Sequence, residues 1–95
     1  MSMMPNVERL QQVIQSISDR SRPFNMWDSN FCVYGHARQL FGGRKGASHS
    51  DYLASTFTIP HKQANDIYHS VDWTREDAIH ALNAIVEQAR STPVA

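Results

Sequence analysis

The chain has 95 residues, which is enough for one domain and too few for two. Hydrophobic residues make up 41% of the composition and charged residues 19%, as in globular proteins and unlike disordered or fibrous ones. This length excludes an enzyme with a separate cofactor domain. We expect a single helical domain over residues 1–95, with frayed tails at 1–5 and 91–95, and no cofactor.

The nine basic and nine acidic side chains cancel to a net charge of zero. General coating of nucleic acid is therefore disfavoured, because it needs an excess of Lys and Arg. Residues 1–50 nevertheless carry six basic and three acidic side chains, a net +3, and residues 51–95 carry the reverse. This asymmetry favours a charge-matched protein partner or a homodimer that pairs basic end to acidic end, unless the fold mixes the two halves.

The cysteine content and the hydropathy of the chain indicate the cellular compartment in which we expect the protein. The chain has one cysteine, Cys32, so an internal disulfide is excluded and a reducing cytoplasm is favoured. The start of the chain lacks the basic and then apolar regions of a secretory signal, and no run of 18 apolar residues occurs. We expect a cytoplasmic protein without a membrane partner.

The first half of the chain predicts two helices. A stripe at spacings of three and four predicts the first helix over residues 7–19: Val7, Leu10, Ile14 and Ile17. Asn6 is its expected N-cap, and residues 21–23 end it before a proline. Residues 24–27 are expected to be an extended connector whose apolar side chains, including Trp27, fill the core. The second helix should begin near residues 28–30 and end at Gly42–Gly43.

The second half predicts three more helices. Ser48 or Ser50 is expected to cap a short helix that contains residues 52–57, and a fourth helix should start at residues 58–60. Thr74 and Asp77 form a variant capping box at the start of the last helix. The apolar positions of that helix are Ala78, Leu82, Ile85, Val86 and Ala89. Because no segment alternates as a strand would, the sequence predicts an all-α domain of five helices.

Two residues four apart, Cys32 and His36, suggest a chemical role. A thiol beside an imidazole is the nucleophile–base pair of cysteine hydrolases, and the two side chains are also weak candidates for zinc ligands. The simpler interpretation is structural. Gly35 is costly inside a helix unless another helix crosses closely there, which makes residues 32–36 a packing node of the core.

Residues 51–69 also fit a helix-turn-helix. Ala54, Ile59, Ala64 and Ile67 fall where that motif places its core residues, and Thr58 stands at the turn. Its second helix would expose four side chains able to hydrogen-bond base edges: His61, Lys62, Gln63 and Asn65. The segment holds a single lysine for phosphate contacts, so sequence-specific DNA binding is the alternative function.

The segments Phe24–Trp27 and Cys32–Ala37 resemble a group of small uncharacterised helical proteins from phages and bacteria. Those proteins pair an F-x-M…W segment with a C-x-x-G-H-A helix, and the likeness spans about residues 24–90. They often carry another cysteine about five residues before the first, where this chain has Trp27. The resemblance implies a mobile-element origin and, by analogy of size alone, an anti-CRISPR or other counter-defence inhibitor.

These observations favour a non-enzymatic protein-binding module, an inhibitor encoded by a phage or mobile element that occludes a host protein. The contact residues we expect are Arg38, Arg44, Lys45, Asp72, Trp73 and Glu76. Trp73 is the aromatic side chain that we expect to be exposed, because it stands between two helices. A metal-binding or catalytic protein built on Cys32 and His36 is the third class.

Overall fold

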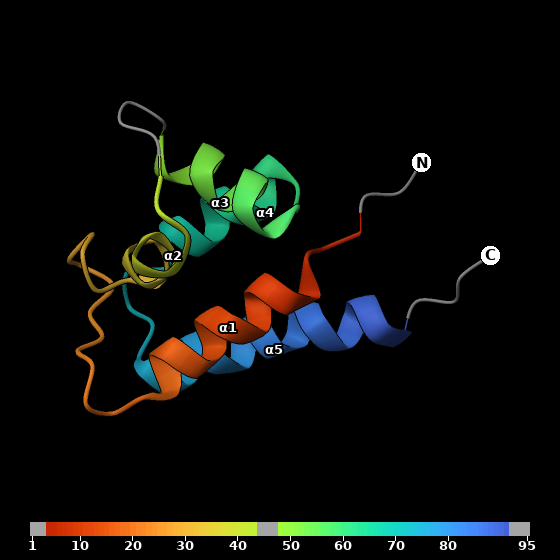
Figure 1. Ribbon diagram of the computed structural model, residues 1–95. Coiled ribbons are helices and arrows are strands. Elements are labelled where there is room, and N and C mark those ends of the chain that lie inside the picture. The colour runs from red at the N-terminus through yellow and green to blue at the C-terminus, as the bar shows by residue number, and fades with distance from the viewer. Residues whose placement is uncertain (1–3, 44–47, 92–95) are drawn as a thin grey trace.

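The fold rests on a pair of antiparallel helices from the two ends of the chain. The computed structural model describes residues 4–43 and 48–91, and in it the first and last helices run side by side while three shorter ones pack above them (Figure 1). The helices are α1 (Val7–Ser18), α2 (Val33–Phe41), α3 (His49–Phe57), α4 (His61–Tyr68) and α5 (Arg75–Ser91). The described residues contain no strand, so the predicted all-α class and the five helices are confirmed.

The predicted caps explain where the helices begin. The Asn6 side chain accepts a hydrogen bond from the Arg9 amide at 3.0 Å, and Ser48 caps α3 through the Asp51 amide at 3.1 Å. Thr74 and Asp77 exchange two bonds of 3.0 and 3.2 Å, so the capping box is confirmed. Each cap supplies a partner to an amide that the helix itself leaves unpaired.

The core joins the two layers of helices. Its most deeply buried apolar side chains come from all five helices and the α3–α4 turn: Leu10, Val13, Ile17, Val33, Ala37, Leu53, Phe57, Ile59, Ala64, Ala78, Leu82 and Val86. The radius of gyration is 12.7 Å, close to the roughly 13 Å expected of one domain of this length. No helix within the described residues is long and apolar enough to cross a bilayer.

The start of α2 differs from the prediction. The helix begins at Val33 with Cys32 as its N-cap, and residues 25–31 form successive turns. The side chains of Asn25 and Asp28 accept hydrogen bonds from amides two residues further on, both at 2.9 Å. Short polar side chains that bind backbone amides in this way compete with helix formation, which moves the helix start about four residues along the chain.

The same turns expose Trp27, which the sequence analysis placed in the core. Its neighbour Met26 is buried at 7% exposure, but Trp27 is 77% exposed, so the prediction that it fills the core was wrong. The chain turns between the two residues, where the Trp27 amide donates to Asn25. One side chain therefore points to the core and the next to solvent.

Gly35 marks a close approach of two backbone segments. A Cβ atom at this position would lie 2.7 Å from the Ser29 carbonyl oxygen and closer still to the carbonyl group of Asn30. The predicted packing node is thus present, but the segment that crosses is the turn before α2 and not another helix. The absence of a side chain lets this turn fold back onto the helix.

We expect Gly35→Ala to destabilise the protein by about 2 kcal/mol or more, because the new methyl group would overlap backbone that cannot move cheaply. Helix propensity alone predicts the opposite effect of this substitution, a gain in stability of about 1 kcal/mol. Gly42→Ala separates backbone strain from steric overlap: its Cβ would meet nothing within 4 Å, and its φ of +70° with ψ of −173° costs an alanine roughly 1–3 kcal/mol. Urea denaturation of both variants measures the difference, and a stabilised Gly35→Ala would contradict the close approach.

Candidate functional site

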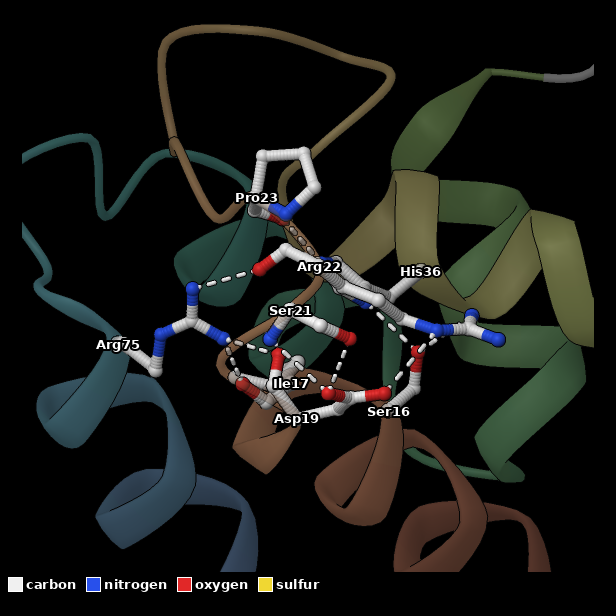
Figure 2. Close-up of polar contacts among 8 residues, drawn as sticks. All are labelled: Ser16, Ile17, Asp19, Ser21, Arg22, Pro23, His36 and Arg75. Atoms are coloured by element: carbon white, nitrogen blue, oxygen red, sulfur yellow. Dashed lines mark hydrogen bonds and ion pairs between the residues drawn. The ribbon is translucent and has the colours of Figure 1, made fainter.

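His36 is buried at 1% exposure in a polar cluster and does not face a thiol. Its Nε2 lies 3.0 Å from the Pro23 carbonyl oxygen, which can only accept, so Nε2 carries the proton. Its Nδ1 lies 2.8 Å from the Ser16 hydroxyl and accepts from it. Both ring nitrogens are therefore occupied, and the imidazole holds α1, α2 and the connector between them together (Figure 2).

The second component of this cluster is Arg75, at the start of α5. Its guanidinium donates to the carbonyl oxygens of Ile17, of Asp19 at 3.0 Å and of Arg22 at 2.7 Å (Figure 2). Arg22 in turn donates to the Ser16 hydroxyl at 3.3 Å, which connects Arg75 to the histidine. The end of α1 is thereby fixed from two directions.

Burial is the largest influence on the electrostatics of His36 and Cys32. Burial, helped by the charges of Arg22 and Arg75, lowers the pKa of His36 against the opposing bond to Pro23. Burial also raises the pKa of the Cys32 thiol, although the first amides of α2 act against it. A protonated thiol is a poor nucleophile, and the His36 ring nitrogens are hydrogen-bonded to Ser16 and Pro23. Within residues 4–43 and 48–91, no three His, Cys, Asp or Glu side chains gather as metal ligands would.

A row of rings crosses α2, α3 and α4, with Tyr34 buried and the other rings at least partly exposed. The Tyr52 ring meets Tyr34 edge-on at 5.2 Å, and Tyr34 lies 4.0 Å from His49. His49 then meets Tyr68 at 4.7 Å, and Tyr68 meets His69 at 5.2 Å. The three longer centroid distances are typical of favourable aromatic packing, so the rings support one another where the row reaches the surface.

Two hollows border this row and share the walls formed by Ser29 and His49. The aromatic groove, of about 420 Å³, is lined by Met26, Trp27, Cys32, His49, Tyr68 and His69. The polar hollow, of about 280 Å³, is lined by Ser29, Asn30, Tyr34, Arg38, Gln39 and His49. Trp27, the most exposed of the large apolar side chains described, thus stands at the edge of an aromatic surface.

The structure distributes the predicted partner-contact residues over separate elements. Arg38 is exposed on α2 and lines the polar hollow. Asp72 is exposed, and Glu76 is exposed but paired with Arg20 at 3.0 Å. Trp73 is half-buried against the core in a groove between α4 and α5, so the expectation that it is the exposed aromatic was wrong. Arg44 and Lys45 lie outside the described residues.

The helix-turn-helix candidates are placed on α4 as expected, with one exception. Three of the four side chains are exposed: His61, Lys62 and Asn65. Gln63 is half-buried in the groove between α4 and α5, so it does not share their surface. His61 contacts Asp51 at 2.5 Å and Asn65 accepts from Ser50 at 3.1 Å, so α3 already binds two of them.

Sequence reasoning missed the aromatic groove because its lining comes from three elements. No spacing along the chain relates Trp27 to His49 and Tyr68, which are 22 and 41 residues further on. The available signal was local: Asn25 and Asp28 are turn-forming residues on either side of Trp27. Comparisons of the chain with protein-family models, curated proteins and solved structures found no match.

We expect the stability of the protein to rise as the pH increases from mildly acidic values to about 7. The pKa of His36 is lower in the folded chain than the roughly 6.5 of an exposed histidine, so between these two pKa values the unfolded chain binds more protons. The stabilisation is complete once the pH is well above the unfolded pKa, and it is lost as the pH falls through the folded pKa.

Urea denaturation across this range measures the slope, which cannot exceed about 1.4 kcal/mol per pH unit for one group. His36→Gln should flatten the profile, whereas His80→Gln, a change at an exposed position of α5, should leave it intact. An NMR titration of the wild-type imidazole gives an independent reading. A His36 resonance that titrates above pH 6.5 would refute the assignment.

Proposed function

We propose that the protein is a non-enzymatic protein-binding module that holds its partner at the aromatic groove, with Trp27 as the anchor. The observation that carries this proposal is a tryptophan at 77% exposure beside a row of tyrosine and histidine rings. Large aromatic side chains are costly to leave in water, and Trp, Tyr and Arg dominate the binding energy of protein interfaces. Trp27, Tyr68 and Arg38 supply all three types on adjoining surfaces.

The turn that carries Trp27 supports the same proposal. Side-chain hydrogen bonds of Asn25 and Asp28 hold it, and the amides of Phe31 and Cys32 both donate to the Asp28 carbonyl at 2.9 Å. A side chain presented by an ordered turn loses less conformational entropy on binding than one on a free loop. The resemblance to small phage proteins leads us to propose a host protein as the partner and inhibition by occlusion as the mode.

We expect Trp27→Ala to abolish partner binding while it changes the free energy of unfolding by less than about 0.5 kcal/mol, because the side chain is mostly in water. The full chain serves as bait in a bacterial lysate, and the captured protein is then purified and titrated by calorimetry. Leu40→Ala, at an exposed apolar position of α2, is the matched control and should bind as the wild type does.

Capture that persists with Trp27→Ala would overturn the groove as the contact surface. Sedimentation of the chain alone separates the case in which the partner is a second copy. A dimer that Trp27→Ala dissociates would place the homodimer interface at the groove, and the proposal of a host partner would then be wrong.

Sequence-specific DNA binding is a second candidate, and the backbone at Thr58 favours it. This residue ends α3 in the left-handed conformation, with φ 53° and ψ 55°, and α4 begins three residues later. The apolar residues around this turn are buried as a helix-turn-helix requires: Ala54, Ile59, Ala64 and Ile67. The charge is less favourable, because Lys62 is the one Lys or Arg between residues 49 and 68.

For this candidate we expect a selection from random duplexes to yield one preferred sequence. The affinity should depend only weakly on salt, with a slope near −1, because a single lysine is available for phosphate on this unit. Asn65→Ala should remove the sequence preference, and Asn83→Ala on the exposed surface of α5 is the control. Failure to enrich any sequence at low salt would eliminate DNA binding.

A further inference from the structure

The polar hollow differs in charge from two other hollows of the described surface, whose linings include Asp51 and Asp66 respectively. None of the described residues that line it, or the aromatic groove beside it, is an aspartate or glutamate. Arg38 supplies a full positive charge, and His49 stands on the wall between the two hollows. A site of this composition suits an anionic group better than a cationic or purely apolar one.

The guanidinium of Arg38 has N–H donors without a hydrogen-bond partner among the described residues. Within the part of the chain that the structure describes, its guanidinium makes one hydrogen bond, a long contact of 3.4 Å to the Tyr34 hydroxyl, and its guanidinium carbon lies 6.0 Å from that ring. Among residues 4–43 and 48–91, no carboxylate comes within ion-pair distance of it, whereas Arg20 and Arg22 each have one, at 3.0 and 3.6 Å. A guanidinium has five N–H groups and binds a carboxylate through two at once.

We propose that the polar hollow is a carboxylate-binding subsite, so that the partner presents an acidic group to Arg38 next to the apolar anchor in the aromatic groove. This inference rests on the proposed protein-binding function and adds the chemistry of the partner. The occupant is an extended protein segment. Its carboxylate lies close to the anchor along the segment, because the two hollows share the walls formed by Ser29 and His49.

The carboxylate has two sources, an Asp or Glu side chain or the end of a polypeptide chain. Selection with a random octapeptide library on beads, with free carboxyl ends and the full-length protein as the probe, samples both. The chosen peptides are then synthesised as acids and as amides and titrated by fluorescence anisotropy. Loss of affinity in the amide form assigns the chain terminus, and loss on Glu→Gln exchange inside the peptide assigns the side chain.

We expect selected peptides to join an acidic group to an apolar residue, and Arg38→Glu to weaken their binding about tenfold, or roughly 1.4 kcal/mol. Arg90→Glu is the matched control, since it changes the net charge equally at an exposed arginine near the end of α5, and it should alter affinity less than twofold. Arg38→Gln, which reverses no charge, is the second variant, and thermal melts verify that each variant folds.

The outcomes separate the inference from the function on which it rests. Peptides that depend on Trp27 but carry no acidic group and ignore Arg38→Glu would overturn the carboxylate subsite alone. Equal weakening by Arg38→Glu and Arg90→Glu would also overturn it, since that marks a general effect of net charge. A library from which no peptide binds through Trp27 would overturn the groove as a binding site and the subsite with it.

Discussion

The contact on which the rest of the structure depends joins Arg75 to the end of α1. A helix leaves its last carbonyl oxygens without partners, and α1 has no basic residue in its last turn to bind them. Arg75 stands at the first position of α5 and reaches the carbonyls of Ile17, Asp19 and Arg22. One side chain thus completes the end of the first helix and fixes the start of the last, which aligns the antiparallel pair.

This contact extends to the candidate binding surface through the backbone it immobilises. Arg22 and Pro23 follow shortly after the end of α1. The Pro23 carbonyl oxygen accepts a hydrogen bond from His36 Nε2 at 3.0 Å. The connector is therefore held in place at Pro23, three residues before Met26. The Met26 side chain is buried in the core, and the next side chain, Trp27, is exposed to solvent. Because α2 is held by His36 and its first turn by the close approach at Gly35, the turn that presents Trp27 is constrained at both ends.

Sequence reasoning succeeded where one short segment decides the structure. The stripe of α1, its Asn6 cap and the Thr74–Asp77 box are set by residues within a turn or two of each other, and all are present. It failed where contacts between segments far apart in the sequence decide which side chains are buried. Trp73 is half-buried in the groove between α4 and α5, and Trp27 is exposed because of a turn that the apolar pattern of its neighbours does not reveal. Composition alone cannot rank two tryptophans when the neighbours that cover them come from elsewhere in the chain.

The charged side chains are mixed over the fold, so a binding site has to be sought in a local group of residues and not at a charged end of the molecule. The basic first half and the acidic second half do not form two ends, because α1 packs along α5 and Arg20 pairs with Glu76 across them. Most described arginines are occupied within the fold, by carboxylates or by carbonyl oxygens. The net charge of zero therefore carries little information about a partner. The surface that we propose for a partner holds the guanidinium of Arg38, which pairs with no carboxylate among the described residues, beside the half-buried ring of His49.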